Sequence, residues 1–165
     1  MMRRQFLLAG AAAGLAGFYG LAARRSDAAE ENFPVMRSEA EWRRQLTPDQ
    51  FAILRQEATE RPFTSPLLHN GRHGLYRCVG CDTAVYSSET KFDSGTGWPS
   101  FWDAVDGGIG TTTDYKLVYP RTAVHCATCG GHLGHVFDDG PKPTGKRHCI
   151  NGIALSFDET SPTSG

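Results

Sequence analysis

Four of the five cysteines in this 165-residue chain form two Cys-x-x-Cys pairs, and these pairs constrain its fold more than any other feature. The pairs are Cys78 with Cys81 and Cys126 with Cys129, and 44 residues (82–125) lie between them. Two such hooks supply four thiolates to one tetrahedral ion and leave no open coordination position. The pattern therefore predicts a structural zinc that joins two distant parts of the chain. Two redox-active disulfides, or one site of each kind, are the alternatives.

The fifth cysteine, Cys149, is left over from this pairing and has a different setting. It follows Arg147 and His148, and two more histidines, His132 and His135, precede it. Basic neighbours favour the thiolate, which is the nucleophilic form of cysteine. The sequence therefore predicts one reactive cysteine beside four structural ones, and with it redox chemistry.

Residues 1–28 have the composition of a targeting segment and are excluded from fold reasoning. Arg3 and Arg4 come directly before a weakly apolar run of 18 residues, Phe6–Ala23, as in a twin-arginine export signal, and cleavage is expected after Ala28. We therefore expect export to the periplasm in folded form, with the metal acquired before export. An uncleaved signal that anchors the chain in the membrane is the alternative, because the run is near spanning length.

The rest of the chain has a composition that favours short strands and turns. It is rich in glycine and proline, with 19 and nine in the whole sequence, which argues against a helical bundle. Without the signal, which holds four arginines and one aspartate, 13 basic and 17 acidic residues remain. Nucleic-acid binding needs a clustered positive field, so no nucleic-acid partner is expected. We expect one domain over residues 38–158, a lead-in over 29–37 and a disordered tail over 159–165.

Two short helices are expected at the start of this domain. Ser38 and Glu41 form a capping-box pattern, and Thr47 with Pro48 starts a second helix that runs to about Ala58. Short segments bounded by glycine, aspartate or serine then read as strands. They are Gly74–Cys78, Thr83–Ser87, Lys91–Phe92, Lys116–Tyr119, Arg121–Cys126, His135–Phe137 and Cys149–Phe157. The sequence thus predicts a mainly β (α+β) domain with N-terminal helices.

Aromatic residues gather on a glycine- and proline-rich loop. Two tryptophans, Trp98 and Trp102, and Phe101 fall within five residues. In isolation this cluster fits core packing. An aromatic cage also suits a thioether or sulfoxide methyl group, because contact between sulfur and an aromatic ring is favourable.

A second cluster lies on the segment that ends ten residues before Cys149. If His135 starts a strand, then His135, Phe137 and Asp139 project from one face as a base, an aromatic wall and a carboxylate. His132 and His135 could alternatively ligate a metal, although no further ligand is evident. Either histidine alone could also be an ordinary surface residue.

Three segments, interleaved with the two cysteine hooks, resemble the methionine-R-sulfoxide reductases of the B type. They are Gly-Trp-Pro-Ser-Phe at 97–101, His-Leu-Gly-His-Val-Phe at 132–137 and Arg-His-Cys-Ile-Asn at 147–151. The resemblance covers residues 42–157. It implies two antiparallel β-sheets with N-terminal helices, one structural zinc per chain and a role in the repair of oxidised proteins.

The resemblance also implies roles for four catalytic residues. Cys149 would attack the sulfoxide sulfur, release methionine and become a sulfenic acid. Arg147 would favour the thiolate, and His135 would protonate the sulfoxide oxygen, because unprotonated oxide is a very poor leaving group. Asp139 would help to orient substrate and water.

Four more residues are expected to bind the substrate. The resemblance implies that Trp98 holds the S-methyl group, that His132 lies in the same pocket and that Asn151 orients substrate and water. Phe137 is added as the aromatic wall beside His135. The expected substrates are oxidised proteins or free methionine sulfoxide.

Thr96 is the main departure from this family. Many members carry a resolving cysteine at this position, and with the four paired cysteines assigned to zinc, Cys149 has no intramolecular partner. The resemblance then implies that an external thiol, such as a thioredoxin-like protein, reduces the sulfenic acid directly, and the chain is expected to act as a monomer. A non-enzymatic zinc-binding module and a thiol enzyme acting on glutathione adducts are the competing hypotheses.

Overall fold

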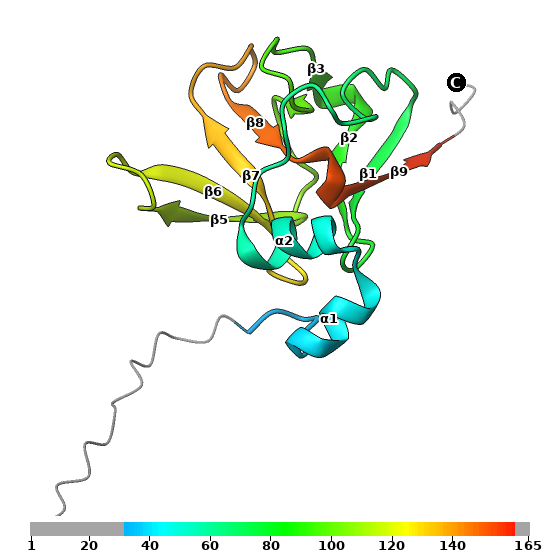
Figure 1. Cartoon of the computed structure of the whole chain (residues 1–165). Helices are drawn as coiled ribbons and strands as arrows, with labels where there is room; N and C mark the ends of the chain where they lie inside the picture. Colours follow the sequence, from blue (N-terminus) through cyan, green and yellow to red (C-terminus); the bar gives the residue numbers. More distant parts are fainter. Residues whose placement is uncertain (1–31, 161–165) are drawn as a thin grey trace, which may run out of the picture. The chain divides into compact units, whose positions relative to one another are not determined.

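The computed structural model describes residues 32–160 of the chain (Figure 1). The predicted signal over residues 1–28, and residues 161–165 of the predicted tail, lie outside this range. Among the described residues, no helix combines the length and the apolar character needed to cross a membrane. The lead-in packs on the domain, since Val35 donates its backbone N–H to the Thr128 carbonyl (2.8 Å).

Both predicted helices are present, and each begins with a capping box. Helix α1 spans Glu39–Gln45 and α2 spans Pro48–Gln56. The hydroxyls of Ser38 and Thr47 accept the amide of the residue three positions on, and that residue's side chain accepts the cap's own amide. Helix α2 ends two residues before the predicted Ala58, because the residue after Gln56 takes a left-handed conformation (φ 53°).

Two antiparallel sheets follow the helices and confirm the predicted fold class (Figure 1). The smaller has the order β2-β1-β9 and the larger the order β3-β4-β8-β7-β6-β5. The strands are β1 (Gly74–Cys78), β2 (Ala84–Ser87), β3 (Lys91–Phe92), β4 (Ser100–Phe101), β5 (Ile109–Asp114), β6 (Arg121–Cys126), β7 (His132–Phe137), β8 (Arg147–Ile150) and β9 (Leu155–Glu159). Two short 3-10 turns, η1 (Ser88–Thr90) and η2 (Gly152–Ala154), complete the element order.

Aromatic rings fill the core between the two sheets. Tyr76 and Tyr86 come from the smaller sheet and Phe101 from the larger one, and all three are fully buried. Phe101 stacks on Tyr86, with ring centroids 4.4 Å apart, and meets Tyr76 edge-on at 5.0 Å. Trp42 of α1 and Leu54 of α2 belong to the same buried cluster. These contacts hold the sheets and helices together as one hydrophobic core.

The predicted strand over Lys116–Tyr119 is wrong. The partner of β6 is β5, and their pairing ends at Asp114 opposite Arg121. Residues 115–120 therefore form the turn between the two strands, and Val118 is fully exposed there. Strand β5 escaped prediction because it is an edge strand whose three consecutive threonines are exposed, so it lacks the apolar alternation of a half-buried strand.

The predicted strand over Cys149–Phe157 is divided between the two sheets. Strand β8 ends at Ile150 in the larger sheet, and β9 starts at Leu155 in the smaller one, with η2 between them. The change of sheet depends on Gly152, whose amide N–H donates to the buried Glu60 carboxylate (2.6 Å). A polar anchor for this turn cannot be recognised from the local pattern of apolar residues.

Two smaller differences concern strand ends and length. Strand β9 includes Glu159, which pairs with Gly74, so the predicted disordered tail from residue 159 begins too early. The two-residue strand β4, within the aromatic loop, was not predicted, because two residues are too few to show periodicity. Strand β4 connects the aromatic loop to β8 through the pairing of Ser100 with Cys149.

Candidate functional site

Strand pairing brings Cys149 and His135 together on the larger sheet. Cys149 of β8 pairs directly with His135 of β7, and two residues along, Arg147 pairs with Phe137. Directly paired residues project from the same face of a sheet, and so do residues two apart in one strand. The thiol, the imidazole, the guanidinium and the phenyl ring therefore share one face.

The thiol and the imidazole open into a small pocket of about 150 Å³. Its lining residues are Thr59, Trp98, Arg121, Gly134, His135, Phe137, Cys149 and Asn151. Five of the eight residues predicted for catalysis and substrate binding are among them. The other three, Arg147, Asp139 and His132, are not among the lining residues. Arg121 was not predicted for the site.

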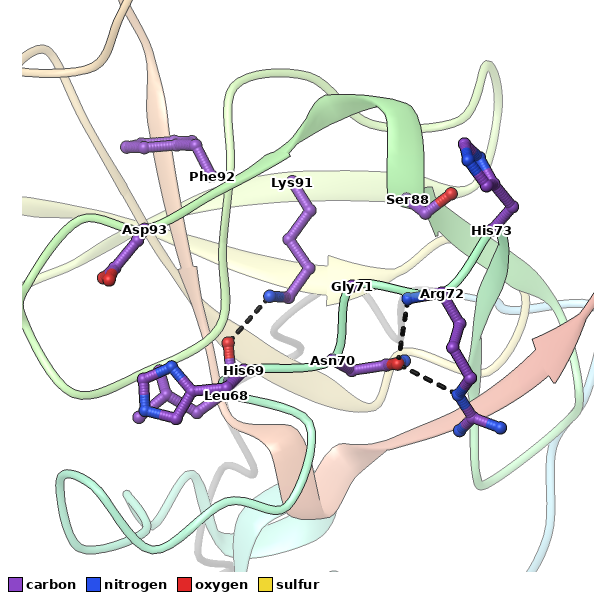
Figure 2. A pocket seen from close by; sticks show the side chains of 10 residues that line it. All are labelled: Leu68, His69, Asn70, Gly71, Arg72, His73, Ser88, Lys91, Phe92 and Asp93. Carbon is purple, nitrogen blue, oxygen red and sulfur yellow. Dashed lines mark hydrogen bonds between the residues drawn. The ribbon is translucent and has the colours of Figure 1, made fainter.

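A larger hollow, of about 400 Å³, shares none of these lining residues (Figure 2). Two of its basic side chains are bonded to other lining residues: Lys91 Nζ donates to the Leu68 carbonyl (2.7 Å), and Arg72 Nε donates to Asn70 Oδ1 (3.1 Å). No cysteine lines it. The Cys149 pocket is therefore the one equipped for sulfur chemistry.

Burial and charge act in opposite directions on the Cys149 thiol. Burial raises its pKa, and the Thr96 hydroxyl, 4.0 Å from Sγ, and the Arg147 guanidinium lower it without cancelling the effect of burial. The Arg147 guanidinium is held in place by two contacts. It donates two hydrogen bonds to the Asp139 carboxylate (2.9 and 2.8 Å), and its Cζ lies over the Phe137 ring, 4.5 Å from the centroid. Asp139 thus contacts Arg147 and does not line the pocket.

The His135 ring is held by Asp114, the last residue of β5 before the β5–β6 turn. Asp114 Oδ2 lies 2.9 Å from His135 Nε2 and accepts a hydrogen bond from Arg121 Nη2 at 2.5 Å. Hydrogen bonds from the Lys116 amide, His135 and Arg121 hold the pKa of Asp114 well below its usual range. An ionised carboxylate therefore orients the imidazole. Sequence reasoning missed Asp114, because only the correct register of β5 and β6 pairs it with Arg121.

His132 lies beside His135 but does not line the pocket. The pairing of β7 with β6 is irregular next to His132, so the two histidines, three positions apart, contact each other edge-on with ring centroids at 5.3 Å. Burial, together with the charge of His135, lowers the pKa of His132 to about 4. His132 is therefore a neutral ring at pH 7 that packs against His135.

Glu60 ties together two walls of the pocket, and the sequence pattern gave no sign of it. Its carbonyl accepts the Trp98 indole N–H (3.1 Å), and its amide donates to Asn151 Oδ1 (3.0 Å). Its carboxylate, in a residue only 6% exposed, accepts the amides of Gly152 (2.6 Å) and Ile153 (3.0 Å). Glu60 therefore fixes the tryptophan, the asparagine and the turn that follows Cys149 relative to one another.

The four paired cysteines form a compact cluster, which confirms that the two hooks meet. All four sulfurs lie within 4.8 Å of one another, with 3.7 Å between Cys78 and Cys129 and 3.5 Å between Cys81 and Cys126. Tetrahedral zinc with bonds of about 2.3 Å needs sulfurs about 3.8 Å apart, so the cluster fits a metal of this kind. Gly130 supplies a left-handed residue (φ 66°) to the second hook. None of the four cysteines lines the Cys149 pocket.

Comparison with known proteins agrees with this arrangement. Residues 46–159 match the SelR domain family. The peptide methionine sulfoxide reductase MsrB of Agrobacterium fabrum is 53% identical over 125 residues, which are 75% of this chain and 93% of that protein. MsrB of Methanosarcina barkeri is 50% identical over 124 residues, 74% of this chain and 87% of its own. The chloroplastic peptide methionine sulfoxide reductase B1 of Arabidopsis thaliana is 48% identical over 136 residues, 82% of this chain and 67% of its own.

Proposed function

The chain belongs to the SelR domain family, and from this premise we propose that it is a peptide-methionine (R)-S-oxide reductase whose nucleophile is Cys149. The observation that carries the proposal is the direct pairing of Cys149 with His135 at one small pocket, where a thiol and a proton donor can reach the same substrate group. Trp98 and Phe137 give this pocket the aromatic walls that suit a methyl sulfoxide.

The reaction transfers one oxygen and two electrons. The Cys149 thiolate attacks the sulfoxide sulfur, and the oxygen leaves as water after taking up two protons, so that Cys149 is bonded to the methionine sulfur in a sulfonium intermediate. A water molecule then attacks the Cys149 sulfur, which breaks this bond, releases methionine and one proton, and leaves Cys149 as the sulfenic acid. The departing oxygen needs a proton, which His135 supplies from the same face of the sheet. The Asp114 carboxylate on Nε2 orients the ring and provides a counter-charge when the ring is protonated.

Arg147 favours the thiolate from the neighbouring position on the same face. The guanidinium lowers the pKa of Cys149 against the effect of burial, and Asp139 keeps the guanidinium in place by two hydrogen bonds. We therefore assign Arg147 to activation of the Cys149 nucleophile, and Asp139 to the positioning of Arg147. Asn151, anchored to Glu60 and to the Leu133 carbonyl, forms the floor beside Cys149.

An external thiol donor completes the cycle in this proposal. Two donor thiols reduce the sulfenic acid to the Cys149 thiol, with release of water and formation of a donor disulfide. Thr96 supports this route, because its hydroxyl faces Sγ at 4.0 Å where a resolving cysteine would otherwise lie. A thioredoxin-like protein is the expected donor. Mass spectrometry after a single turnover should find no disulfide between Cys149 and any other cysteine, and such a disulfide would contradict this step.

Zinc is the metal that we propose for the four-cysteine cluster. Four sulfur donors at tetrahedral spacing suit zinc, and a site closed by four thiolates supports folding without taking part in turnover. Cys78, Cys81, Cys126 and Cys129 would hold it. Its proposed contribution is to join the β1–β2 turn to the β6–β7 turn, on which α2 packs.

We further propose that the enzyme is exported to the periplasm by the twin-arginine route and repairs oxidised proteins there. The support is in the sequence: Arg3 and Arg4 before the weakly apolar run up to Ala23.

A chiral assay tests the function. The metal-loaded protein is given the R- and S-sulfoxides of a blocked methionine, with dithiothreitol as reductant. Consumption of the R isomer alone, and its loss in Cys149→Ser, is the expected result. Turnover of neither isomer by a folded, metal-loaded sample would contradict the proposal and favour a binding module. Release of glutathione from a mixed disulfide, without sulfoxide turnover, would favour a thiol transferase.

A further inference from the structure

The turn between β5 and β6 carries a concentration of exposed apolar side chains. Among residues 32–160, four of the six exposed large apolar side chains lie in this one turn. They are Tyr115 (76% exposed), Leu117 (47%), Val118 (106%) and Tyr119 (61%), and we refer to them as the apolar tip. A cluster of this kind on an otherwise polar surface is typical of a site that contacts another molecule.

The apolar tip is connected to the Cys149 pocket by the last residue pair of the β5–β6 hairpin before the turn. Asp114 and Arg121, which flank the tip, are bonded to each other, and Asp114 contacts His135. Arg121 also lines the pocket. A molecule that reaches into the pocket past Arg121 therefore meets the apolar tip outside it.

The charge within the tip is neutralised by a neighbouring element. The ammonium group of Lys116 forms an ion pair with the Glu57 carboxylate. Glu57 lies two residues before Thr59, another lining residue of the pocket. The ion pair offsets the one charge that Lys116 adds to the tip, and it links the tip to the segment that leads to Thr59.

The size of the pocket requires most of a polypeptide substrate to lie outside it. A volume of about 150 Å³ is well below the roughly 300–1,000 Å³ of sites that enclose a whole small ligand, so it holds little more than the end of one side chain. Methionine is among the residue types most often buried, so a segment that carries it commonly carries other side chains that are buried in the native protein. An oxidised methionine that reaches this pocket therefore arrives on a locally unfolded segment with apolar neighbours.

We propose that the apolar tip is a docking surface for an extended, locally unfolded polypeptide whose oxidised methionine enters the Cys149 pocket. The inference rests on the proposed reductase function and names its substrate class. Apolar side chains on either side of the sulfoxide pack on Leu117, Val118 and the two tyrosines. Strand β5, at the edge of the larger sheet, offers unpaired backbone groups next to the tip to the same extended chain.

The test compares a long and a short substrate in the full-length protein. The variant replaces Leu117, Val118 and Tyr119 by serine together, and its substrates are an unfolded polypeptide bearing methionine-R-sulfoxide and N-acetyl-methionine-R-sulfoxide. Dithiothreitol serves as reductant, so that no protein donor needs to dock. We expect kcat/KM for the polypeptide to fall about tenfold, mainly through KM, and that for the small substrate to change less than about twofold.

The control is Met36→Ser, which removes an exposed apolar side chain (59%) from the lead-in and should leave both substrates unaffected. Unchanged thermal unfolding of the triple variant shows that the hairpin is intact. Equal loss on both substrates, or no loss on either, would overturn the inference. A loss seen only when a thioredoxin-like protein replaces dithiothreitol would assign the tip to the reductant instead. Inactivity of the unsubstituted protein on both substrates would contradict the reductase function itself.

Discussion

The four-cysteine cluster and the Cys149 pocket use the same side chain for opposite purposes. In the cluster, the neighbours of each sulfur are other sulfurs: the four Sγ atoms lie within 4.8 Å of one another, and three of the four cysteines are buried. In the pocket, one half-buried thiol meets an imidazole, a guanidinium and aromatic rings, and it opens to solvent. We therefore expect the groups opposite each cysteine in the fold to decide its reactivity, because burial by itself disfavours the thiolate.

The largest expected effect separates the two regions by stability. Cys126→Ser, like treatment with a chelator that removes the proposed metal, should lower the free energy of unfolding by about 5 kcal/mol or more, because the metal would join two distant turns. A loss of this size is comparable with the whole stability of a small domain. Circular dichroism during thermal unfolding measures the loss. Cys149→Ser is the matched control and should change stability by less than about 1 kcal/mol while abolishing turnover. Similar destabilisation by both substitutions would contradict the division between structural and reactive sulfur.

The second effect concerns the proton donor in the pocket. His135→Asn should lower kcat by about 10²–10⁴-fold, since the departing oxygen loses its proton source. Asp114→Asn should cost about tenfold in kcat and alter the pH profile, because the ring loses its orienting carboxylate. Steady-state kinetics across pH 5–9 distinguishes these outcomes.

Asp138→Asn is the control for the Asp114 substitution. Asp138 is exposed and pairs only with Lys146 at the surface, so the same chemical change there should leave kcat and the pH profile as they are. If Asp114→Asn behaved like this control, the carboxylate would have no part in positioning His135.

Sequence reasoning succeeded where the chemistry is local and failed where it depends on register. Spacing identified the cysteine hooks, which meet in one cluster, and the His132–Phe137 and Arg147–Asn151 segments supplied Cys149 and His135, which the structure places opposite each other. It missed Asp114 and Arg121, because a misplaced strand over Lys116–Tyr119 hid the pairing that joins them.

The helices and several strands were predictable for physical reasons that act within a few residues. Ser38 and Thr47 cap the starts of the two helices as expected, and the structure adds a capping box at Thr47 as well. Glu60 shows the opposite case. Its partners Trp98, Asn151 and Gly152 are 38 to 92 residues away, so no local pattern could indicate that it organises the pocket.

The third effect tests electrostatic activation of Cys149. Arg147→Gln removes the cation that lowers the pKa of the thiol, so this pKa should rise further, by about one unit. Less thiolate is then present at pH 7, and activity there should fall about tenfold and recover as the pH is raised. The difference in thiolate absorbance between each protein and its Cys149→Ser counterpart isolates this titration. Arg72→Gln, at a surface ion pair with Glu159, is the control. An unchanged midpoint in Arg147→Gln would show that the guanidinium does not act on the thiol.

The smallest effect concerns Glu60, which supports the pocket without lining it. Glu60→Gln keeps the shape of the side chain but replaces one acceptor oxygen by an NH2 group, which cannot accept a hydrogen bond. The amide of Gly152 or Ile153 then loses its acceptor, so the free energy of unfolding should fall by about 1–3 kcal/mol. Trp98 and Asn151 are tied to the Glu60 backbone, so activity should fall about threefold to tenfold, mainly through KM.

The pH dependence of stability provides a second readout for Glu60. Burial raises the pKa of its carboxyl above the unfolded value, so its contribution to stability is complete below the unfolded pKa and declines as the pH rises through the folded pKa. The Gln variant cannot ionise, so the stability deficit of Glu60→Gln should be largest at low pH and become smaller as the pH rises through this range. Urea unfolding at several pH values measures the deficit. A deficit that does not vary with pH would mean that the pKa of the Glu60 carboxyl is the same in the folded and unfolded chain, and the deficit would then come only from the lost acceptor for the Gly152 or Ile153 amide.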